Sequence, residues 1–313
     1  MTNGFEAAIE SALGAGRLRH GCPLAPFTTF RVGGPAEWLL EARTSDEIVT
    51  ALTLAHRAGV PVTMLGGGSN VLVSDAGVRG LVIRARGGNI QQAEARRVRA
   101  DAAVTINGLV RWTINHRCAG LEAWAGTPGT VGGAVYGNAH FAGHLIGEVV
   151  TRVRLAARDG TTLDVPRSEM AFGYDDSRLR KTGEILLWAE FEVGEGDPAA
   201  LRSTARASLA FRKRTQPLDT PSAGCIFRNP QPGRDVVPDG LPWSAGALVD
   251  HAGLKGDAVG GARVSTTHGN FIVHDGTATA RDIRQLIERC RIAVHEKFGV
   301  ELREEIVYLG NFD

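Results

Sequence analysis

Apolar residues recur along this chain with two different periods, which separate predicted strands from predicted helices. Short apolar runs at residues 60–65, 81–83, 149–157 and 184–193 predict strands. Helical spacing of apolar residues follows Thr44 and Glu47, which form a capping-box pattern, and occurs again at residues 105–118. Strands and helices alternate in this way up to about residue 193, the order expected of an α/β nucleotide-binding domain.

The sequence GEGDP at residues 194–198 is typical of a linker between domains. Asp197 and Pro198 favour the start of a helix there, which should stop before residue 217. A longer amphipathic helix is predicted at residues 279–298, and a strand at residues 300–308 in which Glu304 and Glu305 point to opposite faces. The pattern predicts a first domain at residues 22–194 and a second, α+β domain at residues 198–313.

Length and composition limit the classes of protein. The chain has 313 residues, enough for two or three domains, and 35 Lys and Arg against 34 Asp and Glu, which favours neither nucleic acid nor a membrane surface as a partner. No apolar run approaches the roughly 18–20 residues that span a bilayer. Cys22, Cys118, Cys225 and Cys290 form no C-x-x-C pair, which indicates a reduced, cytoplasmic enzyme without a zinc site or other metal centre.

Two glycine-rich segments carry the most specific chemistry: LGGGSN at residues 65–70 and GTPGTVGGA at residues 126–134. Each presents backbone N–H groups that no Cβ shields, which suits the oxygens of a phosphate. Neither is a P-loop or a G-x-G-x-x-G fingerprint, because the lysine and the helix-opening pattern are missing. A diphosphate held by two segments far apart in sequence predicts a dinucleotide cofactor.

Seven blocks along the chain resemble, in order, the UDP-N-acetylenolpyruvoylglucosamine reductase family in its shorter, type II form. The blocks are TTFRVGG (28–34), LGGGSN (65–70), GTPGTVGGAVYGN (126–138), SAGCIFRNP (222–230), AGLKG (252–256), GGARVS (260–265) and HGNFIV (268–273). The resemblance implies an α+β fold, with a two-lobed FAD-binding domain of the vanillyl-alcohol-oxidase type and a C-terminal α+β substrate-binding domain. It implies a cytoplasmic monomer whose FAD is reduced by NADPH and then reduces UDP-N-acetylglucosamine enolpyruvate to UDP-N-acetylmuramate, a peptidoglycan precursor.

The resemblance also assigns contacts to residues. Contacts with FAD are implied at Arg31, Gly66, Gly67, Gly68, Ser69, Asn70, Thr127, Pro128, Gly129, Gly132, Gly133 and Asn138. Contacts with the UDP-sugar substrate are implied at Tyr174, Asn229, Lys255 and His268. For Lys255 the alternative is a solvated lysine in a turn, and for His268 it is a structural histidine.

Two residues are implied in proton transfer. Cys225 stands at the position of the proton donor, where the family more often has serine, and a thiol with an ordinary pKa of about 8.5 is mostly protonated at neutral pH. The alternative is a small core cysteine, which is our interpretation of Cys290. Glu305 matches a glutamate that polarises or protonates the reacting centre, and Glu304 is the alternative after a shift of one residue.

The segment FGYDDS at residues 172–177 departs from the family. Asp175 stands where the family has an arginine that pairs with the substrate carboxylate, and loss of such a group typically costs about 10²–10³ in rate. Arg178 is our first candidate for a replacement cation; alternatively, Asp175 faces away and Arg212 supplies the charge to the substrate. Because an acid beside a substrate carboxylate is repulsive, Asp175 is also compatible with a second function: a flavin oxidoreductase of the same fold that acts on another substrate. A third possibility is a non-catalytic FAD- or UDP-sugar-binding protein.

Overall fold

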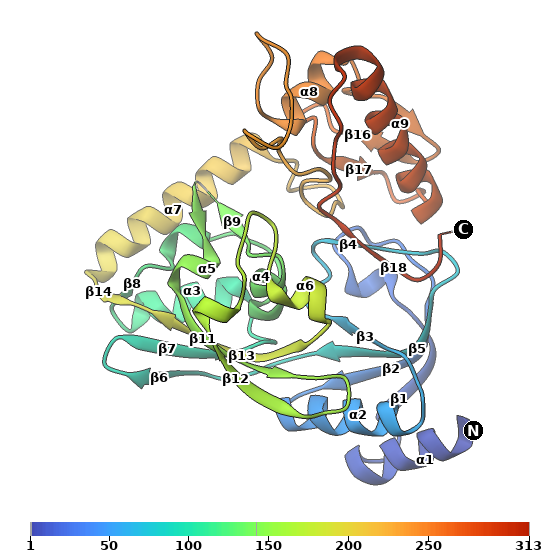
Figure 1. Cartoon of the computed structure of the whole chain (residues 1–313), viewed down its shortest axis with the longest axis vertical. Coiled ribbons are helices and arrows are strands. Elements are labelled where there is room, and N and C mark those ends of the chain that lie inside the picture. Colours follow the sequence, from blue (N-terminus) through green and yellow to red (C-terminus); the bar gives the residue numbers. More distant parts are fainter. Residues whose placement is uncertain (1, 142, 313) are drawn as a thin grey trace. The chain divides into compact units, whose positions relative to one another are not determined.

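The computed structural model describes residues 2–141 and 143–312, which form two compact units (Figure 1). Unit 1 comprises the chain up to Cys22, then Ala36–Gly67 and Arg79–Phe211. Unit 2 comprises Pro23–Pro35, Gly68–Val78 and the chain from Arg212 onwards. Helices and strands are mixed in both units, as expected for an α+β fold.

Unit 1 holds the larger sheets and most of the helices. Its helices are α1 (Thr2–Leu13), α2 (Ser45–Arg57), α3 (Ile106–Asn115), η2 (Glu122–Trp124), α4 (Val131–Tyr136), α5 (Ile146–Val149), η3 (Arg167–Glu169), α6 (Arg178–Thr182) and α7 (Pro198–Thr215), whose last turn belongs to unit 2. Its strands are β1 (Leu18–Pro23), β2 (Pro35–Ala42), β3 (Val62–Leu65), β5 (Val78–Ala85), β6 (Ile90–Glu94), β7 (Arg97–Asp101), β8 (Cys118–Ala119), β9 (His140–Phe141), β10 (His144–Leu145), β11 (Val150–Ala156), β12 (Thr162–Pro166), β13 (Ile185–Glu192) and β14 (Gly194–Glu195).

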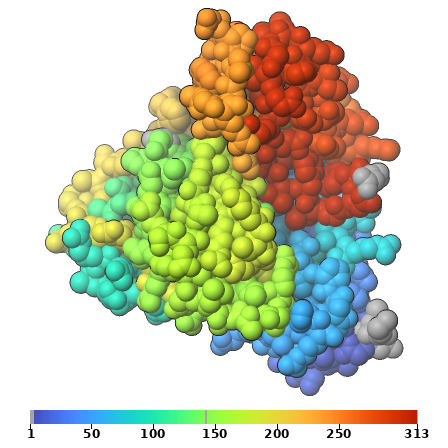
Figure 2. Space-filling model, in the orientation of Figure 1, coloured from blue at the N-terminus to red at the C-terminus, as the bar shows by residue number. Residues whose placement is uncertain are grey.

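Two sheets form the two lobes that the resemblance implies for the FAD-binding domain. One has four strands in the order β1-β2-β5-β3, and the other has five in the order β12-β11-β13-β7-β6. β3 and β5 run parallel, whereas the pairs of the five-stranded sheet are antiparallel. The segment from β11 to β13, yellow-green in Figure 2, forms much of the visible face of this unit.

Three helices of unit 1, α2, α3 and α7, begin where the sequence predicts. Oγ1 of Thr44 accepts a hydrogen bond from the backbone N of Glu47 at the start of α2, and Thr105 does the same for Gly108 at the start of α3. Asp197 caps α7 by accepting from the backbone N of Ala200 at 2.9 Å. The predicted apolar positions of α2 and α3 face the core, because helical periodicity places them on one side of each helix.

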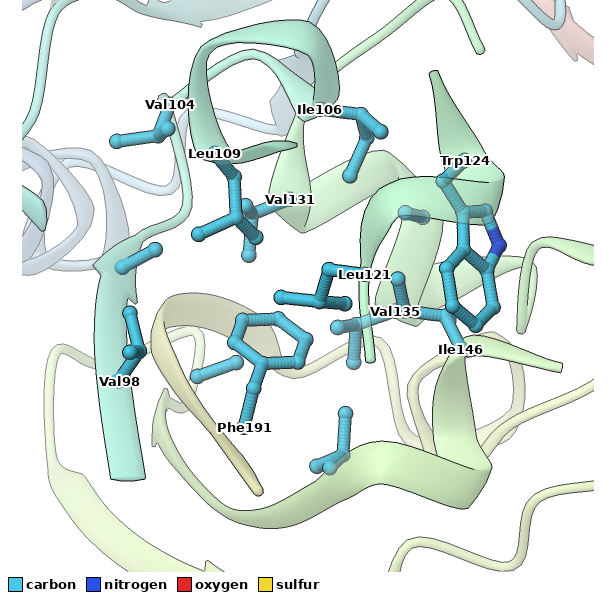
Figure 3. Close-up of a cluster of buried hydrophobic side chains, with 14 of the residues drawn as sticks. Val98, Val104, Ile106, Leu109, Leu121, Trp124, Val131, Val135, Ile146 and Phe191 are labelled. Atoms are coloured by element: carbon cyan, nitrogen blue, oxygen red, sulfur yellow. The ribbon is translucent and has the colours of Figure 1, made fainter. Parts of the chain in front are cut away.

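A cluster of buried apolar side chains joins the five-stranded sheet to α3 and α4. Phe191 of β13 lies among Leu121, Val131 and Val135 in Figure 3, and all four side chains are almost fully buried. Val131 begins α4, the helix that follows the second glycine-rich segment. The hydrophobic core therefore fixes the position of that segment.

Unit 2 is smaller and is built around one long helix. Its elements are η1 (Ala25–Phe27), β4 (Val71–Val73), α8 (Ala245–His251), β15 (Ala258–Val259), β16 (Ala262–Val264), β17 (Ile272–His274), α9 (Ala280–Phe298) and β18 (Val307–Leu309). The strands form a sheet of order β15-β16-β17 and a parallel pair of β18 with β4. Thr279 caps α9, and the apolar stripe predicted from the sequence is buried in the core of this unit.

The last predicted strand is shorter than expected. Only Val307–Leu309 is a strand, because its partner β4 has only three residues. Within residues 300–306, Glu304 forms an isolated bridge with Phe227.

The two units also differ from the predicted boundaries at residues 22–194 and 198–313. Residues 23–35 and 68–78 belong with the C-terminal unit, since β4 pairs with β18, and most of α7 belongs with unit 1. Within residues 2–141 and 143–312, no helix combines the length and the apolar character needed to cross a bilayer.

Candidate active site

The two glycine-rich segments meet in unit 1, backbone against backbone. A Cβ atom on Gly67 would lie 2.7 Å from Cα of Gly129, and one on Gly66 would lie 2.7 Å from Oγ1 of Thr130. A side chain at residue 67 would push the two segments apart, so glycine is required at this close approach. The result is a cradle of main-chain groups, which suits a diphosphate.

Neighbouring elements fix the second segment. Thr130 caps α4, its Oγ1 accepting from the backbone N of Gly133 at 3.3 Å. Asn107 of α3 accepts from the backbone N of Gly126 at 2.7 Å through Oδ1 and donates through Nδ2 to the carbonyl oxygen of Thr127 at 3.2 Å. Asn107 is not predicted from the sequence, where its only signal is a polar residue in the first turn of an amphipathic helix.

The rest of the first segment belongs to unit 2. Gly68 has φ +63°, and a Cβ there would overlap the carbonyl oxygen of Phe27. Nδ2 of Asn70 donates to the carbonyl oxygen of Glu305 at 3.2 Å, and the carbonyl oxygen of Asn70 accepts from the backbone N of Val307 at 3.0 Å. Asn70, predicted as a cofactor contact, therefore also positions the segment that carries Glu305.

The remaining predicted cofactor contacts divide between the units. Asn138 is buried, and its side chain bonds to the protein: Nδ2 donates to the carbonyl oxygen of Gly173 at 2.7 Å, and Oδ1 accepts from the backbone N of Gly147 at 2.8 Å. Asn138 thus supports the turn at residues 173–176, which carries Tyr174. Arg31 and Ser69 lie in unit 2, and Thr127, Pro128, Gly132 and Gly133 lie in unit 1.

Replacing Gly67 by valine is expected to reduce the FAD content of the purified protein severely, since the new Cβ would meet the Cα of Gly129 at 2.7 Å. The measurement is the ratio of flavin to protein absorbance, followed by titration of the apoprotein with FAD. Gly4→Ala is the matched control, because nothing lies within 4 Å of a Cβ at that position. Normal FAD affinity in Gly67→Val would contradict the cradle.

In unit 2, two chain segments run side by side and bring Cys225 and Glu305 close in the fold. The backbone N of Glu305 donates to the carbonyl oxygen of Ile226 at 2.8 Å, and Phe227 and Glu304 form an antiparallel bridge. The residue next to Cys225 is thus bonded to the predicted glutamate. The structure therefore places both predicted proton-transfer residues in one part of unit 2.

Glu304, the alternative to Glu305, is engaged in an ion pair. Its carboxylate accepts from Nη1 of Arg284 on α9 at 2.7 Å, and the same nitrogen lies 2.9 Å from the hydroxyl of Tyr308. The Glu304 carboxylate is therefore held by α9, and Glu305 stays our prediction for the residue that takes part in the chemistry.

A buried arginine ends α7 beside Cys225. Burial lowers the pKa of Arg212 to about 10, and the negative charge of a Cys225 thiolate acts in the opposite direction. A cation whose pKa is shifted by burial beside a reactive group is typical of a functional site. The structure therefore supports Arg212 as the cation suggested in the alternative reading of Asp175.

Arg178, our first candidate for the replacement cation, makes a two-pronged ion pair with Glu184. Nε and Nη2 donate to its carboxylate at 2.8 and 2.9 Å, and this pairing raises the pKa of Arg178. The two N–H donors on this edge of the guanidinium are already bonded to Glu184, and a substrate carboxylate would have to displace it. The geometry therefore counts against Arg178.

The other predicted substrate contacts of unit 2 make bonds within the protein. Oδ1 of Asn229 accepts from the backbone N of Ala245 at the start of α8, at 3.0 Å. Lys255 pairs with Asp250 at 2.6 Å. Nδ1 of His268 accepts from the backbone N of Asn270 at 3.2 Å, as expected for a neutral, structural histidine. A substrate that used these side chains would compete with existing bonds.

Acid is expected to destabilise the protein partly through His268. Burial, and secondly the charge of Lys255, hold the pKa of His268 below its usual value of 6.5. The unfolded chain therefore binds a proton there before the native protein does, and the free energy of unfolding falls as the pH drops through 6.5. Urea unfolding at pH 7.5 and 5.5 should show a smaller loss in His268→Gln than in the parent. His251→Gln, at an exposed position, is the control, and an equal loss in all three proteins would contradict the assignment.

Comparison with known proteins agrees with this geometry. A family model described as "FAD binding domain" matches residues 36–166, and one described as "UDP-N-acetylenolpyruvoylglucosamine reductase, C-terminal domain" matches residues 216–309. The UDP-N-acetylenolpyruvoylglucosamine reductase of Synechococcus sp. (strain WH7803) is 40% identical over 301 residues, 94% of this chain and 94% of the relative. That of Moorella thermoacetica (strain ATCC 39073 / JCM 9320) is 38% identical and covers 92% of each chain.

The crystal structure of the UDP-N-acetylenolpyruvylglucosamine reductase of Thermus caldophilus matches this fold with a TM-score of 0.76 at 32% identity, covering 94% of this chain and 98% of that one. Fold and glycine cradle together define an FAD-binding α+β protein with a C-terminal reductase domain. More narrowly, the chain belongs to the UDP-N-acetylenolpyruvoylglucosamine reductase family.

Proposed function

We propose that this protein reduces UDP-N-acetylglucosamine enolpyruvate to UDP-N-acetylmuramate for peptidoglycan synthesis, with FAD as the bound cofactor and NADPH as the reductant. The observation that carries the proposal is the buried Arg212 beside Cys225, in a unit that matches the C-terminal domain of the reductases. A protein that only bound FAD or a UDP-sugar would have no use for an acid beside a buried cation.

The residues divide the chemistry between them. The two glycine-rich segments would hold FAD, and the cofactor, once reduced by NADPH, would supply the hydride needed at the β-carbon of the enolpyruvyl group. Negative charge then develops towards the carboxylate, where the Arg212 guanidinium stabilises it. Cys225 donates a proton to the α-carbon and is left as a thiolate, which the same cation stabilises. Glu305, bonded through its backbone to Ile226, polarises the reacting centre.

The test is NADPH oxidation by the purified holoenzyme with and without UDP-N-acetylglucosamine enolpyruvate. Substrate-dependent oxidation with formation of UDP-N-acetylmuramate is the expected result. If NADPH reduces the flavin but the substrate fails to reoxidise it, the substrate assignment is wrong and a flavin oxidoreductase with another substrate takes its place. Flavin that NADPH cannot reduce would instead favour a non-catalytic binding protein.

We further propose that the enzyme works as a monomer in the cytoplasm and does not bind nucleic acid. Four cysteines that form no C-x-x-C pair suit a reducing compartment, and the near-equal numbers of basic and acidic residues give no basic surplus for nucleic acid. Sedimentation equilibrium of the holoenzyme at micromolar concentration should give the mass of one chain, 33.2 kDa.

A further inference from the structure

A buried carboxylate in unit 1 has one oxygen bonded to a histidine and one oxygen left over. Asp175 is only 2% exposed, and its Oδ1 lies 3.1 Å from Nδ1 of His140. Among the described residues, its Oδ2 has no hydrogen-bond partner. A buried carboxylate oxygen without a partner is costly, and such groups call for an explanation beyond packing.

The backbone around this pair is held in unusual conformations. Asp175 has φ +50° and Asn138 has φ +45°, both in the left-handed region that non-glycine residues seldom adopt. They are linked, because Asn138 donates to the carbonyl oxygen of Gly173, in the turn that carries Asp175. Strained backbone held by specific bonds is found preferentially at functional sites.

The pair lies next to residues already assigned to the site. His140 begins β9, two residues after Asn138 and shortly after α4, the helix of the second glycine-rich segment. Its ring centroid is 5.0 Å from that of Tyr174, a predicted substrate contact. The His140 side chain is 34% exposed while the Asp175 side chain is 3% exposed, so the histidine presents the pair to a ligand.

We propose that His140, oriented by Asp175, donates a hydrogen bond from Nε2 to the carboxylate of the enolpyruvyl substrate. A carboxylate bonded to Nδ1 fixes the ring and stabilises the imidazolium, whose Nε2 then carries a proton to donate. The acid at residue 175 is therefore a positioning residue that supports a donor, and does not itself repel the substrate. This inference rests on the proposed function, which supplies a substrate with a carboxylate.

The test compares two ligands that differ in this carboxylate. Calorimetric titration of the oxidised holoenzyme with UDP-N-acetylmuramate should show binding weakened about 10–100-fold in His140→Ala, the loss expected for one charge-assisted hydrogen bond. Affinity for UDP-N-acetylglucosamine, which lacks the carboxylate, should not change. His140→Gln keeps an N–H donor near the position of Nε2 and should recover part of the affinity.

His144→Ala is the matched control, because His144 is an exposed histidine on the neighbouring strand β10. Asp175→Asn should weaken binding of UDP-N-acetylmuramate in the same selective way, and FAD content reports whether each variant is folded. The inference would be overturned if His140→Ala bound UDP-N-acetylmuramate as tightly as the parent, or if it lost affinity equally for both ligands. Turnover of the enolpyruvyl substrate by the parent would still uphold the proposed function in that case. A parent protein that neither binds UDP-N-acetylmuramate nor turns over the enolpyruvyl substrate would instead overturn the proposed function, and this inference with it.

Discussion

Replacing Cys225 by alanine is expected to slow turnover of the enolpyruvyl substrate by about 10²–10⁴-fold, the usual contribution of a positioned general acid. The loss should fall on reoxidation of the reduced flavin by the substrate, because protonation of the α-carbon occurs in that half of the reaction. Reduction of the flavin by NADPH should keep its rate. Stopped-flow absorbance of the flavin measures both halves separately.

Cys225→Ser is the informative partner of this variant, since a hydroxyl keeps a proton donor at the same position. It should retain much more activity than Cys225→Ala. Thiol alkylation should inactivate the parent, with bound substrate protecting it, and should leave Cys225→Ser unaffected. Cys22→Ala, at another partly exposed cysteine, should behave like the parent. Full turnover by Cys225→Ala would show that the proton comes from elsewhere.

Replacing Arg212 by methionine is expected to lower kcat/KM for the enolpyruvyl substrate by about 10²–10³-fold, the typical cost of removing one electrostatic group from an active site. Methionine keeps much of the side-chain volume without the charge. Nη1 of Arg212 also donates to Oε1 of Gln216 at 3.5 Å, so thermal unfolding is needed to separate a loss of stability from a loss of activity. Steady-state kinetics and thermal unfolding of the holoenzyme together test this.

Lys213→Met provides the control for Arg212→Met, because Lys213 is the next residue of α7 and is exposed. It should change neither kinetics nor stability. If Arg212→Met instead unfolded at a much lower temperature with normal kcat/KM, Arg212 would be a structural residue and not the cation of the active site.

Local features of the fold could be predicted from the sequence. Thr44, Thr105 and Thr279 each precede an apolar stripe with helical spacing, and each caps the helix that follows. Capping and periodicity depend on residues within a few positions of one another, so a single sequence contains them. The sequence also predicts that the two glycine-rich segments hold one diphosphate together, because both expose backbone N–H groups that no Cβ shields.

Features that depend on distant partners could not be predicted in this way. The sequence indicates Arg178, or alternatively Arg212, as the replacement for the missing arginine. It gives no sign that Nδ1 of His140, 35 residues before Asp175, lies 3.1 Å from the Asp175 carboxylate. The sequence likewise gives no sign that residues 68–78 group with the C-terminal unit, since nothing in the short run at β4 indicates that its neighbour is the last strand. Side-chain pairing and strand pairing across the chain leave no local periodicity to detect.

The parallel pair of β4 and β18 has a consequence for synthesis of the protein. Asn70, just before β4, bonds to Glu305, 235 residues later, so β4 acquires its strand partner β18 only after translation has nearly finished. Contacts between distant parts of a chain form slowly, and segments that await them are exposed to aggregation and proteolysis. Unit 1 has its own core and most of its residues before that point. A fusion at the C-terminus that hinders β18 would therefore impair the maturation of a segment encoded in the first quarter of the gene.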